Sequence, residues 1–261
     1  MNRLTHKLEK LNKKNKKALV AYLVAGDPDM ESTLEIMHMF VESGVDIIEV
    51  GVPFTDPIAE GPIIQRAHDR AIKEKVSLED IFELIIKFRS KDEETPIVLM
   101  GYLNSFIFHK NLIEKNQNNS VDSVLVVDIP GELNIADYGV KNENINTISL
   151  ISPTTKNERV KSIANNSTGF IYYVTLRGVT GSSNLDVAEI KKNIKEIKKY
   201  AKVPILAGFG IKSPEDAKIL SNCADGIIIG SSIVKMIEEG SSTKEFDKIG
   251  SYLADIKKAI S

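Results

Sequence analysis

The stretch Ser43-Gly-Val-Asp-Ile-Ile-Glu-Val-Gly51 places one carboxylate before an apolar run and a second, Glu49, inside it. If the run is a strand, alternation puts Ile47 and Glu49 on one face and Ile48 and Val50 on the other. Both faces of a strand in a parallel α/β sheet are buried, so we expect Glu49 to point into a core. A buried carboxylate without a partner is costly or takes up a proton, which makes Glu49 a functional candidate.

The same phrase returns twice further along the chain. It reads Ser120-Val-Asp-Ser-Val-Leu-Val-Val-Asp128 in the second copy and Cys223-Ala-Asp-Gly-Ile-Ile-Ile-Gly230 in the third. In each copy an apolar residue and an Asp precede a buried strand that ends in glycine or an acid. Equivalent units that recur in this way are expected of a barrel.

Short runs rich in Val and Ile alternate with longer segments of helical period along the chain. The runs predict eight strands, at residues 18–24, 45–51, 97–100, 121–129, 145–151, 170–175, 203–208 and 226–229. The segments of helical period predict helices at residues 32–42, 78–89, 104–115, 134–141, 157–165, 187–200, 214–220, 232–239 and 243–260.

This alternation predicts the fold class. A strand followed by a helix eight times over is typical of an α/β protein whose parallel sheet closes as a (β/α)8 TIM barrel. The lysine-rich N-terminus predicts an extra helix before the first strand, and no stretch has the composition of a linker. We therefore expect a single (β/α)8 barrel domain over residues 1–261, with an open doubly wound sheet as the alternative.

The composition limits the classes of partner. A net charge of −2 argues against a general nucleic-acid binder, which is usually basic. No apolar run approaches the roughly 18 residues that span a bilayer, and the first residues lack the apolar segment of a secretory signal. The single cysteine, Cys223, permits no intrachain disulfide and fits a reducing compartment. We expect a cytoplasmic protein that binds neither nucleic acid nor membrane.

Residues that could carry chemistry gather near the ends of the expected strands. In a barrel of this kind the working groups lie at the C-terminal ends of the strands and in the loops that follow them. An acid or a tyrosine lies in or at the end of several expected strands, and the loop at residues 54–62 adds two more carboxylates. The candidates are Tyr22, Glu49, Asp56, Glu60, Asp128 and Tyr172.

Three glycine-containing loops follow the last three expected strands. They are Arg177-Gly-Val-Thr-Gly-Ser-Ser183, Ala207-Gly-Phe-Gly-Ile211 and Ile229-Gly-Ser-Ser232. Glycine lets backbone N–H groups approach an anion closely, and the helix that begins at Ser231 adds its N-terminal dipole. These loops predict a phosphate site, at the place where (β/α)8 enzymes frequently hold one.

The chain carries no pattern for other common cofactors or nucleophiles. Its four histidines show no metal-ligand spacing, and no Gly-x-Ser-x-Gly elbow is present. The first expected strand is not followed by the Gly-x-Gly-x-x-Gly of a dinucleotide site. The residues alone therefore predict an enzyme that acts on a phosphorylated small molecule by acid–base chemistry with carboxylates, without a metal or redox cofactor.

The segment Glu49-x-Gly-x-Pro-Phe-Thr-Asp-Pro-x-Ala-Glu-Gly-Pro-x-Ile-Gln65 closely resembles the signature of the tryptophan synthase α subunit family. The resemblance implies retro-aldol cleavage of indole-3-glycerol phosphate to indole and glyceraldehyde 3-phosphate, in the last stage of tryptophan biosynthesis. It also implies no cofactor in this chain, and a β subunit with pyridoxal phosphate that takes up the indole in an α2β2 heterotetramer. Further matches occur in the right order, at Gly26-Asp-Pro28, Gly178-Val-Thr-Gly181, Gly208-Phe-Gly210 and Gly230-Ser231.

The resemblance assigns different roles to the two central carboxylates. Glu49 would be the general acid–base that takes the glycerol hydroxyl proton and helps to protonate indole C3. Glu60 would face the indole N–H, at a position where the family pattern usually has Asp. The added methylene moves the charge by ~1.5 Å, and a misplacement of about that size can cost ~10²-fold in rate. We expect the loop to compensate, so that Glu60 keeps the role.

The other matching positions receive roles from the resemblance as well. Tyr172 would be the active-site tyrosine. Tyr22 stands where Phe is common and would line the indole pocket, with a place in the core as the alternative. Asp56 would take part in loop closure, with a turn-forming carboxylate as the alternative. The remaining positions are Phe209 in the indole pocket, Gly181, Gly210, Gly230 and Ser231 at the phosphate, Thr180 in loop closure, and Asp128 in support of the site.

Two other functions compete with this hypothesis. One is a different phosphate-handling barrel enzyme of the same pathway, an isomerase or the synthase that makes indole-3-glycerol phosphate. The synthase is expected to need a catalytic Lys at a strand end, and no expected strand ends in Lys. The other is a barrel kept mainly as an activating subunit for its β partner.

Overall fold

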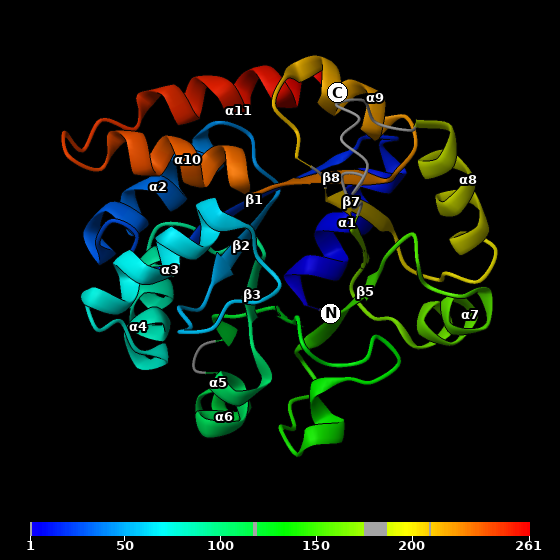
Figure 1. Ribbon diagram of the computed structural model, residues 1–261, viewed down its shortest axis with the longest axis horizontal. Helices are drawn as coiled ribbons and strands as arrows, with labels where there is room; N and C mark the ends of the chain where they lie inside the picture. Colours follow the sequence, from blue (N-terminus) through cyan, green and yellow to red (C-terminus); the bar gives the residue numbers. More distant parts are fainter. Residues whose placement is uncertain (1, 117–118, 175–186, 209) are drawn as a thin grey trace.

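Eight parallel strands close into a barrel in the computed structural model, in which residues 2–116, 119–174, 187–208 and 210–261 are described (Figure 1). Each strand pairs with its neighbours in the sequence, and β1 pairs with β8 to close the ring. This confirms the predicted (β/α)8 barrel over the open sheet. The strands are β1 (Ala18–Val24), β2 (Ile47–Gly51), β3 (Ile97–Gly101), β4 (Ser123–Val126), β5 (Asn146–Ile151), β6 (Ile171–Val174), β7 (Ile205–Gly208) and β8 (Gly226–Ile229).

Helices surround the strands, and α1 lies within the ring that they form in the view of Figure 1. Several begin with a capping side chain; for example, Ser213 accepts a hydrogen bond from the backbone N–H of Asp216. The helices are α1 (Arg3–Lys13), α2 (Met30–Glu42), α3 (Pro62–Lys73), α4 (Leu78–Arg89), α5 (Leu103–Phe108), α6 (Lys110–Lys115), the 3₁₀ helix η2 (Ile135–Tyr138), α7 (Asn157–Asn166), α8 (Val187–Ile197), α9 (Pro214–Ser221), α10 (Ser231–Gly240) and α11 (Asp247–Ala259).

Helix α3 was not predicted from the sequence. It begins at Pro62, directly after a loop rich in glycine and proline. Pro62 stands at the start of the helix, where its missing N–H costs nothing. Ala67 and Ala71 are buried from the helix against Val24 of β1 and Val234 of α10. This apolar spacing of four residues was the available signal.

Two predicted helices are wrong in their extent. The segment 104–115 forms two helices, because His109 adopts a non-helical conformation between α5 and α6 while its ring contacts Glu79 of α4. The segment 134–141 forms only the single 3₁₀ turn of η2. A capping box of Asn134 and Asp137 starts that turn, and Gly139 ends it with a positive φ of 84°.

The N-terminal end of the barrel is closed by α1. Leu4, Leu8 and Leu11 of this helix form one buried cluster with inward-facing strand residues such as Val20 and Ile47. The lysines of this segment lie mainly on its exposed side. The barrel interior is therefore a packed core at this end.

The three copies of the repeated phrase share one structural device. In each, the Asp before an even-numbered strand accepts a hydrogen bond from a backbone N–H of the preceding strand. Asp46 accepts from Leu19, Asp122 from Ile97, and Asp225 from Ile205, each at 2.9 Å. The backbone N–H of each Asp donates in return to the backbone carbonyl of the strand residue from which its side chain accepts. The repeat therefore fixes the register at the N-terminal ends of the strands.

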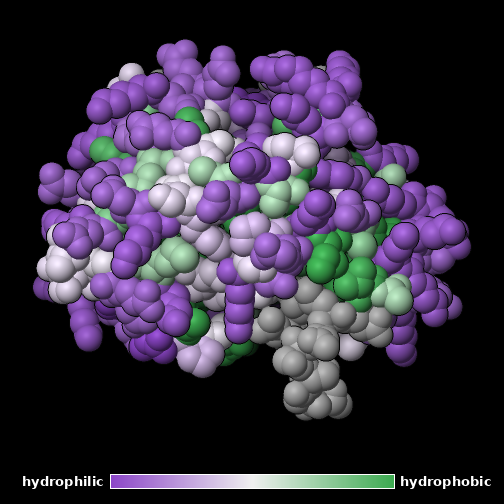
Figure 2. Space-filling model, turned by 90° about the horizontal axis from the view of Figure 1, so that it is seen from above, coloured by the Kyte–Doolittle hydropathy of each residue, from purple (hydrophilic) through white to green (hydrophobic). Residues whose placement is uncertain are grey.

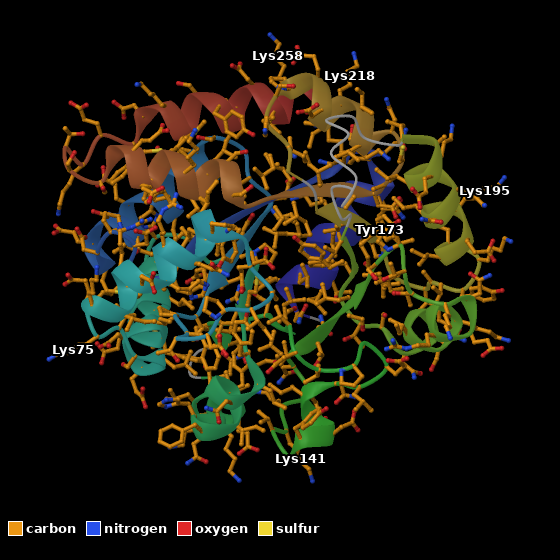
Figure 3. All side chains as sticks on the ribbon, in the orientation of Figure 1. Lys75, Lys141, Tyr173, Lys195, Lys218 and Lys258 are labelled. Atoms are coloured by element: carbon orange, nitrogen blue, oxygen red, sulfur yellow. The ribbon has the colours of Figure 1, made fainter. Side chains whose placement is uncertain are left out.

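The outer surface is mainly polar. Figure 2 shows a face covered largely by hydrophilic side chains, with hydrophobic ones in small groups. Figure 3 shows Lys75, Lys195 and Lys258 at the periphery, directed away from the barrel. Within the described ranges, no helix combines the length and the apolar character needed to cross a membrane.

Candidate active site

Glu49 lies near the C-terminal end of β2 and faces the barrel interior, as the alternation predicted. Its side chain is 2% exposed, and Ile47 on the same face packs in the interior cluster. Burial raises the pKa of Glu49 to about 8, and the charge of Glu60 adds to the effect. Its Oε1 has no hydrogen-bond partner among the residues described. A carboxyl with this pKa can both donate and accept a proton near neutral pH.

Glu60 lies in the loop between β2 and α3 and is largely buried. Burial raises its pKa, while a hydrogen bond from the Tyr102 hydroxyl acts in the opposite direction. The same hydroxyl accepts a hydrogen bond from the backbone N–H of Ala59 at 3.0 Å. Tyr102 thus holds the end of the loop and its carboxylate together. Sequence reasoning missed Tyr102, because its partner Glu60 is 42 positions away and no local pattern joins them.

Two tyrosines lie near these carboxylates. Tyr172 points inward, whereas Tyr173 points toward α8, where its hydroxyl accepts a hydrogen bond from Asn193 (Figure 3). Tyr22 is 2% exposed, and its hydroxyl has no partner among the residues described. Burial raises the pKa of Tyr172 and of Tyr22, and the charge of Glu49 adds to both. Both hydroxyls therefore remain protonated and can donate hydrogen bonds.

Glycines make room for these two rings. A Cβ at Gly208 would collide with the hydroxyl of Tyr172, and a Cβ at Gly51 would collide with the hydroxyl of Tyr22. Both glycines are the last residues of their strands, β7 and β2. Close approach of ring and backbone at these two points requires glycine.

A cavity of about 760 Å³ opens at the C-terminal ends of the strands. Its inner wall is apolar, with Leu125, Leu150 and Ile228 among the side chains, and Glu60 and Tyr172 bring polar groups to it. An apolar wall with a few convergent polar groups is typical of a small-molecule site. Glu49 itself does not line this cavity; it is buried in the barrel interior, close enough to Tyr172 of the cavity wall for its charge to raise the pKa of that tyrosine.

One side of the cavity is formed by glycines and a helix N-terminus. Gly210, Gly230 and Ser231 all line it. Gly230 precedes the first residue of α10, Ser231, and has no side chain to cap the helix. The first N–H groups of α10 are therefore available to an anion, with the helix dipole in a favourable direction.

Asp128 and Asp56 lie in different surroundings from Glu49 and Glu60. The predicted strand 121–129 is too long: β4 ends at Val126, and Asp128 lies in the turn that follows. There its Oδ1 accepts a hydrogen bond at 2.8 Å from the N–H of Leu103, the first residue of α5. Asp56 is exposed in the loop before α3, where its carbonyl accepts from Ile58. Neither side chain lines the cavity.

The remaining expected positions, Thr180, Gly181 and Phe209, lie outside the described residues. No group of three or more His, Cys, Asp or Glu side chains suited to a metal ion occurs in the part of the chain that the structure describes.

Comparison with known proteins gives the family. The sequence model of the family named Tryptophan synthase alpha chain matches residues 8–260. The tryptophan synthase alpha chain of Neisseria meningitidis is 43% identical to this chain over 94% of each. That of Nitrosomonas europaea is 39% identical over 100% of this chain and 96% of its own length.

Solved structures agree with these relatives. The crystal structure of tryptophan synthase subunit alpha from Legionella pneumophila matches with a TM-score of 0.91 and 37% identity. The match covers 100% of this chain and 98% of that one. Fold, length and sequence therefore agree, and this chain belongs to the tryptophan synthase alpha chain family.

Proposed function

We propose that Glu49 and Glu60 are the two carboxylates that carry the family's reaction in this chain. Tryptophan synthase alpha chains are lyases that cleave indole-3-glycerol phosphate to indole and glyceraldehyde 3-phosphate in tryptophan biosynthesis. The observation that carries the proposal is the buried carboxyl of Glu49, which has a pKa of about 8 and an Oε1 without a hydrogen-bond partner among the described residues.

Glu49 is the general acid–base in this proposal. It takes the proton of the glycerol hydroxyl as the bond between the indole ring and the glycerol carbon breaks, and it helps to deliver a proton to indole C3. A single group can serve both steps when its pKa lies near the working pH. The pKa of about 8 places Glu49 in that range.

Glu60 accepts the indole N–H and stabilises the positive charge that the ring acquires when C3 is protonated. The carboxylate is held by the Tyr102 hydroxyl rather than by a cation, so its charge remains available to the ring. Tyr172 borders the same cavity. By resemblance, Tyr22 and Phe209 would line the indole pocket; the side chain of Tyr22 is buried in the barrel.

The phosphate of the substrate binds at the N-terminus of α10. Gly230 and Ser231 offer backbone N–H groups there, and Gly210 lines the same side of the cavity. By resemblance, Gly181 joins this set, Thr180 and Asp56 take part in closure over the substrate, and Asp128 supports the loop after β3 through its bond to Leu103.

The family name implies a β subunit, and we extend the proposal to an α2β2 heterotetramer in the cytoplasm. The β subunit would hold the pyridoxal phosphate and take up the indole, and residues 1–261 would act as one barrel domain. Three large apolar side chains at the cavity end of the barrel support such docking. Ile58 and Leu133, in the loops after β2 and β4, are 74% and 39% exposed, and Phe108, the last residue of α5, is 82% exposed.

An indole-release assay on indole-3-glycerol phosphate tests the two carboxylates. It compares wild type, Glu49→Gln and Glu60→Gln, with and without β subunit, and measures activation of the β subunit in parallel. Glu49→Gln is expected to abolish indole release and to leave β activation intact, which also separates the enzyme from a barrel that only activates its partner. Unchanged indole release in Glu49→Gln would exclude the proposed acid–base, and kcat/KM of Glu60→Gln within a few-fold of wild type would exclude the role of Glu60.

A further inference from the structure

His68 of α3 is a buried polar residue that the proposed reaction does not use. Its side chain is 2% exposed, and its Nδ1 accepts a hydrogen bond from the backbone N–H of Phe54 at 3.1 Å. Burial lowers the pKa of His68 to about 4, so the ring is neutral near neutral pH. The proton is then on Nε2, because Nδ1 is the acceptor.

The neutral ring leaves one polar atom unsatisfied. Nε2 has no hydrogen-bond partner among the residues described. A buried N–H without a partner is unfavourable, and an apolar side chain at this position would avoid that cost. His68 provides what an apolar side chain lacks, an acceptor for the backbone N–H of Phe54. This hydrogen bond fixes the start of the loop between β2 and α3.

Phe54 connects this bond to the site. Its ring stacks on Tyr102, with ring centroids 4.6 Å apart and an angle of 16° between the planes. The Tyr102 hydroxyl in turn donates to Glu60 and accepts from the N–H of Ala59. The side chain of Tyr102 thereby connects the start of the loop, at Phe54, with its end, at Ala59 and Glu60.

We infer that His68 is a positioning residue, which sets the place of the Glu60 carboxylate through Phe54 and Tyr102. The inference rests on the function proposed for Glu60. It also explains how a Glu is accommodated in place of the usual Asp: the longer side chain is fixed at its end by Tyr102, whose ring is held by Phe54. His68 touches none of the reacting atoms in this arrangement.

The test compares His68→Leu with His68→Asn in the full chain together with its β subunit. The Oδ1 of Asn takes the place of Nδ1 and can accept from Phe54, whereas Leu has a similar size and no acceptor. We expect kcat/KM for indole release to fall about 10- to 100-fold in His68→Leu, mainly through kcat. His68→Asn should stay within a few-fold of wild type. If His68 acted through packing alone, the acceptor in His68→Asn would not be expected to restore kcat/KM.

A second pair of variants keeps the test independent of the folding of His68→Leu. Phe54→Leu retains the backbone N–H but removes the stacked ring, so it should lower kcat to a similar extent with His68 in place. Tyr102→Phe removes the hydroxyl, and adding His68→Leu to it should cause little further loss. Additive losses in that double variant, or equal activity of the Leu and Asn variants at position 68, would overturn the inference.

The Glu60→Gln variant separates the two proposals. If Glu60→Gln retains kcat/KM, the proposed function of Glu60 fails, whatever His68 does. If Glu60→Gln is impaired while His68→Leu and Phe54→Leu are both active, only the positioning role of His68 fails.

Discussion

The β2 segment carries two carboxylates in opposite surroundings, Asp46 directly before the strand and Glu49 within it. At the N-terminal end, Asp46 accepts from the N–H of Leu19 at 2.9 Å and from the ammonium of Lys257 at 2.5 Å. Three residues later, Glu49 has no ion pair, and its Oε1 is unpartnered among the described residues. The acid before the strand helps to hold the barrel together, and the acid within the strand is kept reactive, as the division of labour between the two ends of (β/α)8 barrels predicts.

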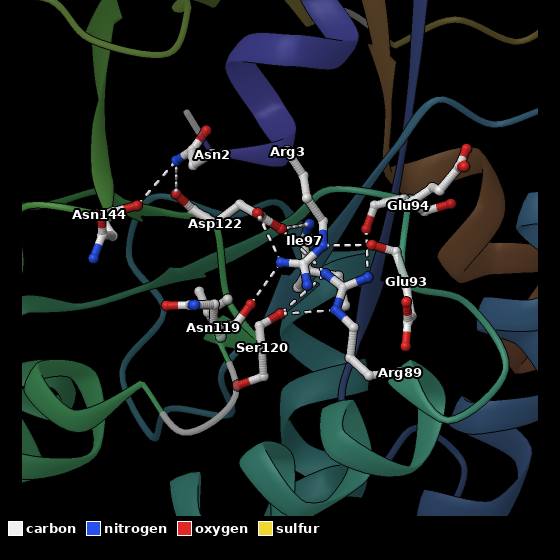
Figure 4. Close-up of polar contacts among 12 residues, drawn as sticks. Asn2, Arg3, Arg89, Glu93, Glu94, Ile97, Asn119, Ser120, Asp122 and Asn144 are labelled. Atoms are coloured by element: carbon white, nitrogen blue, oxygen red, sulfur yellow. Dashed lines mark hydrogen bonds and ion pairs between the residues drawn. The ribbon is translucent and has the colours of Figure 1, made fainter.

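The same division extends around the barrel. Asp122 accepts from the N–H of Ile97 and from the guanidinium groups of Arg89 and Arg3, which converge on it in Figure 4. Burial raises the pKa of Asp122, and these donors offset part of the effect. At the cavity end, the donors to Glu60 among the described residues are neutral, from Tyr102 and from its own loop. Asp122 is thus paired with cations, whereas Glu60 is held by neutral groups.

The most direct test of this difference is to replace Glu49 and Asp46, one at a time, by their amides. Glu49→Gln should lower kcat/KM for indole release by about 10²- to 10⁴-fold without loss of unfolding free energy at pH 7. Asp46→Asn should have the opposite profile, a loss of about 1–3 kcal/mol in stability with nearly unchanged kcat/KM of the folded protein. Urea unfolding and the indole assay measure both. A large activity loss in Asp46→Asn would end the division between the two ends.

Removal of the most buried acid at the N-terminal end should have the largest effect on stability. Asp122→Ala leaves Arg89, which is 8% exposed, without its nearer carboxylate, with Asp92 at 3.9 Å as the farther one, and leaves the N–H of Ile97 unpaired. Breaking one side of a buried ion pair costs about 3–5 kcal/mol. Asp122→Asn is the matched control, because it keeps an acceptor for Ile97. Equal urea midpoints for Asp122→Ala and wild type would show that this network contributes nothing.

The pH dependence of stability should also show the unusual state of Glu49. The pKa of Glu49 is about 8 in the folded protein and 4.5 in the unfolded chain. The unfolded state therefore ionises first, and wild type loses stability as pH rises from 4.5 to about 8. Glu49→Gln lacks this loss, so its advantage over wild type should grow by at most about 1.4 kcal/mol per pH unit and then level off. A difference that stays constant over this range would mean that the pKa of Glu49 is not raised.

Much of this arrangement is visible in the sequence, and the limits have physical reasons. The inward direction of Glu49 follows from strand alternation, and the Asp of the repeated phrase precedes each strand within a few residues. Both are local patterns. The contacts of Tyr102 and His68 are not local, because they join residues 42 and 14 positions apart through the folded loop. No periodicity records such contacts.

The extent of single elements was also hard to predict where a side chain competes with the backbone pattern. Val124-Leu-Val-Val-Asp128 continues its alternation to the end, yet Asp128 turns away to bind the N–H of Leu103, and the strand stops at Val126. The ring of His109 contacts Glu79 of α4 where the predicted helix divides. In both places a contact with another element decides the boundary.

The smallest effect is expected where a repeated Asp has an exposed partner. Asp225 binds the N–H of Ile205, and its ion pair with Lys198 at 2.7 Å joins side chains that are 35% and 45% exposed. Exposed pairs contribute about 0.2–1 kcal/mol, so Lys198→Met should change the urea midpoint slightly and leave kcat/KM unaltered. Asp225→Ala should cost more, because it also leaves the N–H of Ile205 unpaired. If Lys198→Met were as damaging as Asp225→Ala, the cation rather than the backbone bond would be the essential part of the repeat.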